Sequence, residues 1–229
     1  MAGKLKSVLR IPKLRLAAKA IVIALGLYFL PVWAAGILAA LLYFIPTAFS
    51  FSFIGTFVSF AVLMGSLFSV HPAAFAAVLS GILFFLLLGV KNVVFLHRSP
   101  VFFFLCGALT LFGLWEFFSG IVSLPILAMI VFIVCRDAFN QFAPSPAGGA
   151  GRTSLLAAVV ALLVAELSWG VFYLNIPVWW ASVAVFMVFA GVLNAIVKYL
   201  RGTLYKTNAP FWATALAIFS ATILLLVSF

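Results

Sequence analysis

The chain has 229 residues, of which 68% are hydrophobic and only 7% are charged. Soluble domains average about 45–50% apolar and about 25% charged residues, so this chain has too few charges to cover a surface in water. The composition therefore excludes a soluble globular domain and predicts a protein embedded in lipid. Its apolar stretches are continuous, unlike the short alternating segments of a membrane β-barrel, and they predict membrane-spanning α-helices.

The charge balance is strongly basic, with 13 Lys and Arg against three Asp and Glu and a net charge of +10. A nucleic-acid-binding protein gathers its cations in one patch, whereas here they stand in small groups between apolar segments. Such spacing is typical of the signals that orient a protein in a membrane. The expected partner is therefore the bilayer, with anionic lipid head groups at the cytoplasmic face, and nucleic acid is not expected.

The first 19 residues carry six cations and predict a basic cytoplasmic segment, followed by a single transmembrane domain over 20–229. Part of this segment has its leucines near one helical face and could lie on an anionic leaflet, although Pro12 interrupts the pattern. The simpler interpretation is that the charges hold the N-terminus in the cytoplasm. The six cations are Lys4, Lys6, Arg10, Lys13, Arg15 and Lys19.

No Lys, Arg, Asp or Glu occurs from Ala20 to Val90. With about 1.5 Å of rise per residue and about 30 Å of hydrocarbon, this stretch allows three comfortable crossings or four short ones. An even number brings Lys91 to the side of the N-terminal segment, so that all 13 cations face the cytoplasm. Four crossings are therefore predicted, at about 16–31, 33–49, 53–70 and 73–90.

The rest of the chain predicts two helical hairpins, over 99–135 and 153–197, and a last helix over 209–229. The total is an all-α, polytopic bundle of nine helices with a cytoplasmic N-terminus, expected in the cell (inner) membrane. The alternative is seven helices with a re-entrant segment between 46 and 72, where residues 49–53 alternate Phe with Ser. A Pro- and Gly-rich cytoplasmic loop is expected at 140–152.

Alanine recurs every four residues in two of the predicted helices, and such a stripe can allow close helix packing. Alanine is so common in this chain that the same spacing could also arise by chance. The two cysteines, Cys106 and Cys135, lack a CxxC or a Cys/His spacing, so no disulfide framework, metal site or cofactor is predicted. The six tryptophans fall near the predicted span ends, as interface anchors do. The alanines are Ala157, Ala161 and Ala165, and then Ala213, Ala217 and Ala221.

Two glutamates, Glu116 and Glu166, stand alone in apolar helices and are the first candidates for a functional site. Each is followed four residues later by a glycine and then by a proline turn, which suggests a repeated hairpin. On the predicted threading both lie in the outer part of the membrane, with His71 and Asn175 on the same side. Together these four residues form a candidate intramembrane polar site, although each glutamate could instead lock the bundle through a hydrogen bond.

A second set of candidates lies on the cytoplasmic side, where cations at helix ends could contact lipid phosphate or a partner. The simpler interpretation is that these long side chains extend to the interface. The set comprises Lys91, Arg98, Arg136, Lys198 and Arg201.

Three functions are consistent with these features. A small-solute or proton-coupled transporter fits the intramembrane carboxylates, the helix breaks and the suggested repeat. A structural or accessory subunit, in a homo-oligomer or with other membrane proteins, fits the minimal loops and small-residue stripes. An intramembrane lipid-modifying enzyme is the third alternative, but the chain has no GxSxG motif and no aspartate pair, so no catalytic residue is assigned.

Overall fold

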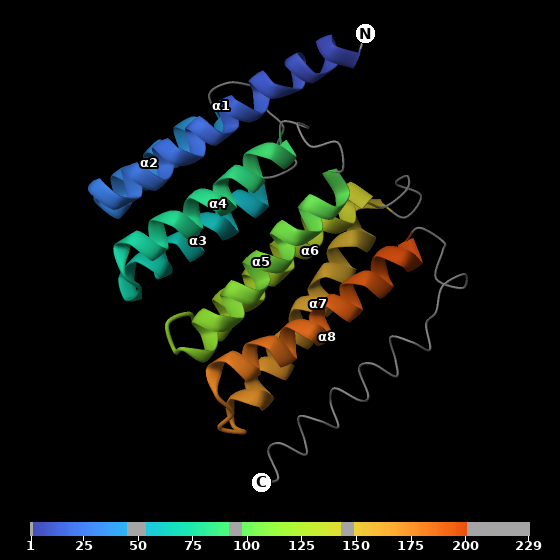
Figure 1. The fold of residues 1–229 in the computed structure, drawn as a ribbon. Helices are drawn as coiled ribbons and strands as arrows, with labels where there is room; N and C mark the ends of the chain where they lie inside the picture. The colour runs from blue at the N-terminus through green and yellow to red at the C-terminus, as the bar shows by residue number, and fades with distance from the viewer. Residues whose placement is uncertain (1, 45–53, 92–97, 143–148, 201–229) are drawn as a thin grey trace. The chain divides into compact units, whose positions relative to one another are not determined.

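The computed structural model describes residues 2–44, 54–91, 98–142 and 149–200, shown in Figure 1. Within these ranges the chain forms eight α-helices and no strand. They are α1 (Ala2–Phe29), α2 (Val32–Phe44), α3 (Ile54–Val70), α4 (Ala73–Lys91), α5 (Arg98–Phe118), α6 (Leu124–Phe142), α7 (Gly149–Phe172) and α8 (Val178–Leu200). The all-α prediction is confirmed, and the helix predicted over 209–229 lies outside the described residues.

Five helices contain apolar stretches long enough to cross a membrane, as in a membrane-embedded multi-pass protein. These stretches are Ala73–Lys91, Val101–Phe118, Leu124–Gln141, Gly151–Phe172 and Val178–Leu200. Helix α2 is equally apolar but has only 13 residues, which span about 20 Å and fall short of the hydrocarbon thickness. Helix α3 is continuous over 17 residues, so the described part of the alternative re-entrant segment is helical.

Prolines mark where several helices begin. Pro31, Pro72 and Pro177 directly precede α2, α4 and α8, and their carbonyl oxygens accept hydrogen bonds from N–H groups in the first turns. A proline suits this position because the first turn needs no N–H from it. Pro12 is predicted to interrupt the helical pattern of the N-terminal segment, but it lies inside the continuous helix α1. A proline removes one bond of the helical ladder, and here the helix continues on both sides.

The loop predicted at 140–152 is helical at both its ends, because residues 140–142 belong to α6 and residues 149–152 belong to α7. The remaining residues of that loop, 143–148, lie outside the described part of the chain. Residues 143–148 thus connect α6 and α7, which pack against each other.

The chain divides into two compact units, Met1–Leu105 and Cys106–Phe229, and the boundary falls within α5. In the first unit α1 packs against α2 and α4, and α3 packs against the same two helices. Large apolar side chains from all four helices fill the interior of this unit. The fully buried ones include Ile23, Tyr43, Phe60, Leu63, Leu67, Phe84, Leu87 and Leu88.

Helices α1 and α4 approach closely at Gly81. A Cβ atom on Gly81 would lie 3.0 Å from the Cβ of Ala24 and 3.3 Å from the carbonyl oxygen of Ala20. Ala20 and Ala24 are four residues apart, and so are Ala77 and Gly81, so each helix brings a pair of small residues to the contact. Small residues at this spacing allow two backbones to pack without large side chains between them.

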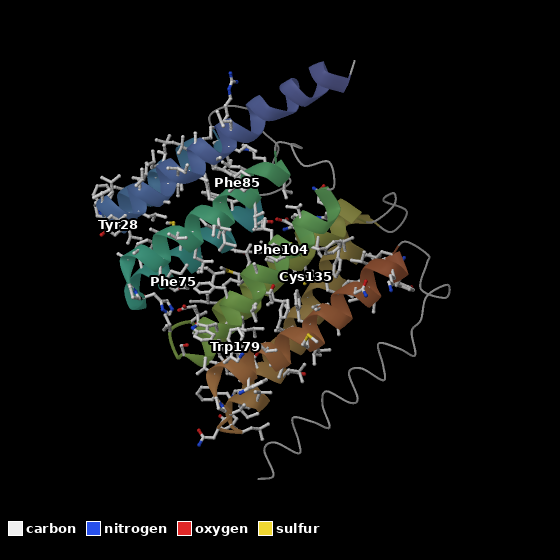
Figure 2. The ribbon with its side chains drawn as sticks, in the orientation of Figure 1. Tyr28, Phe75, Phe85, Phe104, Cys135 and Trp179 are labelled. Carbon is white, nitrogen blue, oxygen red and sulfur yellow. The ribbon has the colours of Figure 1, made fainter. Side chains whose placement is uncertain are left out.

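In the second unit α7 packs against α6 and α8. Its small residues Ala157, Ala161 and Ala165 are all buried, as expected for a stripe that faces neighbouring helices. The corresponding stripe over 213–221 lies outside the described residues. Cys106 and Cys135 are free thiols buried in this unit, and Figure 2 labels Cys135 on α6.

Candidate functional site

The first unit brings two lysines to one helix end. The Lys91 ammonium, at the end of α4, donates a hydrogen bond to the carbonyl oxygen of Tyr43. The Lys19 ammonium, from α1, donates a longer one of 3.5 Å to the carbonyl oxygen of Leu42. Both acceptors belong to the last turn of α2, whose carbonyls have no partner within their own helix. We call this arrangement of Lys19, Lys91 and the last turn of α2 the lysine-pair site.

The Tyr43 ring makes a second contact with Lys91, through a cation–π interaction. The Lys91 Nζ atom lies 3.9 Å from the centroid of the Tyr43 ring and 5.4 Å from that of Phe44. An ammonium over an aromatic face is attracted by the negative face of the ring. The Lys91 side chain is only 8% exposed, so its charge depends on these contacts more than on water.

An aromatic cluster fixes the end of α2 in place. The fully buried Tyr43 ring stacks on Phe57 of α3, with centroids 4.5 Å apart and planes at 18°. Phe57 in turn contacts Phe60, and Phe60 contacts Phe84 of α4. Because these rings connect three helices, the carbonyl groups that receive the two lysines are held by the core of the unit.

Lys19 and Lys91 therefore meet at the end of α2, the arrangement expected from an even number of crossings before Lys91, and the number of crossings itself stays a prediction. Lys91 is among the candidates predicted from the sequence, whereas its neighbours Lys19 and Tyr43 are not. The predicted membrane topology could have revealed this contact. With an even number of crossings before Lys91, the predicted spans 33–49 and 73–90 both end on the side of the membrane where Lys19 lies.

The second unit has its own cationic end. Arg152 of α7 donates a hydrogen bond of 2.8 Å to the Tyr199 hydroxyl of α8. Next to it along α7, the Thr153 hydroxyl donates one of 2.8 Å to the side-chain oxygen of Asn140 on α6. Lys198 is half-buried on α8, and Arg136 is exposed on α6. Of the other cytoplasmic candidates, Arg98 begins α5 and Arg201 lies outside the described residues.

Aromatic residues gather at the opposite end of these helices. In the second unit the Trp115 and Trp179 rings meet edge to face with centroids 5.6 Å apart, and Figure 2 labels Trp179 near the start of α8. Tyr28 and Trp33 take the corresponding place in the first unit, at the end of α1 and the start of α2. Aromatic residues at span ends are typical of a membrane–water interface. The exposed ones are Tyr28, Trp33, Trp169, Tyr173, Trp179 and Trp180.

Glu116 lies at this aromatic end and is fully buried, with 0% of its surface exposed. Helix α5 stops two residues later through a Schellman motif. The Gly120 N–H bonds the carbonyl of Phe117, and the Ile121 N–H bonds that of Glu116, at 2.9 and 3.0 Å. Gly120 has φ +78°, a conformation that glycine adopts without steric cost.

Glu166 has a different environment, which argues against the suggested repeat. It is exposed on α7 and stands six residues before the end of that helix. Gly170 lies inside α7, and the residue with positive φ at this helix end is Asn175, at 54°. The two Glu–Gly spacings therefore match in sequence but not in structure, because the two helices end at different distances from their glutamates. Asn175 lies in the turn between α7 and α8.

His71 belongs to the first unit, in the turn between α3 and α4. Its N–H donates a hydrogen bond of 3.0 Å to the Leu67 carbonyl, and its ring lies 5.8 Å from that of Phe75. A meeting of His71 with the two glutamates stays a prediction. Among the described residues, no group of three or more His, Cys, Asp or Glu side chains is placed to hold a metal ion.

Comparison with protein-family models, with curated proteins and with solved structures finds no match to this chain.

Proposed function

We propose that this multi-pass membrane protein moves a proton or a small solute, and that Glu116 is the group through which it acts. The observation that supports the proposal is the complete burial of the Glu116 side chain in an apolar helix. An ionisable residue at such a position is costly to insert into a membrane, and in pumps and transporters acidic residues form proton relays.

The residues next to Glu116 in sequence pack the end of α5 against α7 and α8. Trp115 contacts Trp179 of α8, and Phe117 contacts Phe172 of α7 with ring centroids 6.0 Å apart. Leu114 is fully buried one turn from the helix end. A carboxyl group buried at this packed helix end can bind a proton or a hydrogen-bonding solute where bulk water does not reach.

The two glutamates provide a matched pair of variants. The purified full-length protein would be reconstituted into liposomes loaded with a pH-sensitive dye, and proton flux would be measured under an imposed gradient. Glu116→Gln is expected to abolish the flux, while Glu166→Gln, at an exposed position, keeps most of it. Size-exclusion profiles of both variants check that they fold. Normal flux in Glu116→Gln would eliminate the proposal.

A second candidate function, an accessory subunit, is favoured by the exposure of Glu166. The carboxylate shares its helix with exposed Leu155, Val159, Leu162 and Trp169. A carboxylate facing lipid costs about 3 kcal/mol at the bilayer centre, so a partner helix that offers a hydrogen bond would stabilise it.

The test of this second function is the mass of the particle purified in mild detergent. We expect a homo-oligomer or a stable complex for the wild type and for Glu116→Gln, and its loss in Glu166→Leu. A monomer in all three preparations contradicts the accessory role and leaves the transport proposal standing.

A further inference from the structure

The first unit carries positive charge that no carboxylate side chain within it neutralises. All three acidic residues of the chain, Glu116, Asp137 and Glu166, come after residue 105, so the unit Met1–Leu105 has no carboxylate side chain. Yet two ammonium groups from different helices meet at the end of α2, close enough for Lys19 to act electrostatically on Lys91. Two like charges held together in this way favour an anion from outside the unit.

The end of α2 offsets only part of this charge. The C-terminus of a helix carries about half a negative charge, against two full positive charges, so about 1.5 positive charges remain at the site. Burial makes the remainder more costly, since Lys91 is almost fully enclosed and Lys19 is half-buried. One singly charged phosphodiester would neutralise most of the excess.

The two ammonium groups also have hydrogen-bonding capacity to spare. Each ammonium has three N–H donors. In the described part of the chain each of these two lysines donates one hydrogen bond, to Leu42 and to Tyr43 respectively. Within the described residues, four donors are therefore left for the oxygens of an acceptor group placed between them.

The surroundings of the site suit a lipid more than a free ion. One turn from Lys19 along α1 the side chain of Val22 is exposed, and on the neighbouring helix α2 so is the side chain of Leu41, next to Leu42. Exposed apolar surface therefore begins within one turn of Lys19. An acyl chain can lie along this surface while its head group reaches the lysines.

We propose that the lysine-pair site binds the phosphate of an anionic phospholipid, with Lys19 and Lys91 as its two ligands. The site is independent of the proposed transport function, because Glu116 belongs to the other unit. Loss of lipid binding and loss of flux would therefore be separate results.

The test uses the full-length protein in a neutral detergent, with native mass spectrometry to count bound lipid. We expect phosphatidylglycerol to bind and phosphatidylcholine to bind far more weakly. At about 1 kcal/mol per lysine, affinity for phosphatidylglycerol should fall about fivefold in Lys19→Gln and about thirtyfold in Lys19→Gln/Lys91→Gln. Lys19→Gln alone carries the test if the double variant fails to fold, since Lys19 is the less buried of the two.

The matched control is Lys4→Gln/Lys6→Gln, which removes the same number of charges from the same unit. Retained affinity in this control, together with loss in the Lys19 and Lys91 variants, supports the site. Equal losses in both double variants mean that charge number alone governs binding, and they overturn it. Displacement of the lipid by millimolar inorganic phosphate, or unchanged binding in Lys19→Gln, overturns the lipid assignment as well.

Discussion

Lys91 and Tyr43 lie 48 residues apart in the chain, yet the ammonium of one donates a hydrogen bond to the carbonyl of the other and lies 3.9 Å from the centroid of its ring. The pair joins the end of α4 to the end of α2. The Tyr43 ring also stacks on Phe57. The contact between Lys91 and Tyr43 therefore combines a hydrogen bond that caps α2, a cation–π interaction and packing in the aromatic core.

Removing the Lys91 ammonium should destabilise the first unit. Lys91→Met keeps an apolar stem but loses the cap and the cation–π contact, so the free energy of unfolding should fall by about 1–3 kcal/mol. Thermal unfolding in a detergent without anionic lipid measures the loss. The exposed Arg136→Met is the control, and equal melting temperatures for the two variants would contradict the role of the pair.

Gly120 and Gly170 should respond in opposite ways to alanine. Gly120→Ala forces a side chain into a positive-φ conformation and should cost about 1–2 kcal/mol. Gly170→Ala lies inside α7 with no atom within 4 Å of the new Cβ, and should stabilise the helix by about 0.5–1 kcal/mol. Unfolding curves of the two variants check this. Equal effects would restore the repeated hairpin that the sequence suggests.

The close approach of α1 and α4 should not tolerate a larger residue at Gly81. Gly81→Leu places its side chain against the backbone of Ala20 and the Cβ of Ala24, so the two helices must separate. We expect a lower melting temperature and a broader elution profile. Gly65→Leu is the control, because a Cβ on Gly65 meets no atom within 4 Å. Similar behaviour of both variants would refute the tight α1–α4 contact.

The two native thiols should be inert in the folded protein. Cys106 and Cys135 are buried in the second unit, so a maleimide should add to neither before denaturation and to both after it. Intact-mass measurement counts the adducts. Rapid labelling of either thiol in native protein would show that this interior is open.

The orientation can be read from single cysteines in a background with both native thiols replaced by alanine. Ser119→Cys lies in the turn after α5, at the aromatic end, and Arg152→Cys lies at the cationic end of α7. Because cations favour the cytoplasmic side, an impermeant maleimide added to intact cells should label Ser119→Cys and spare Arg152→Cys. The reverse pattern would contradict a cytoplasmic position for the cationic end of this unit.

The candidate polar site shows where sequence reasoning reaches its limit. Glu116 and Glu166 each stand between apolar residues in sequence and each precede a glycine by four residues, so no local rule separates them. Their difference comes from helix length beyond the glutamate and from which face each helix buries. Both depend on contacts between helices, such as Phe117 with Phe172, that periodicity alone does not specify.

The order of residues was by itself enough to determine that the described part of this protein is all helical and mostly apolar, and it located most of the described helix boundaries to within a few residues. In lipid every backbone N–H and C=O group needs a hydrogen-bond partner within the protein, and an α-helix supplies these partners. Prolines and charged residues then mark where the helices begin and end. Only the tertiary structure decided which side chains meet. Packing of several helices at once buried Glu116, exposed Glu166, and brought Lys19 and Lys91 to the carbonyls of α2.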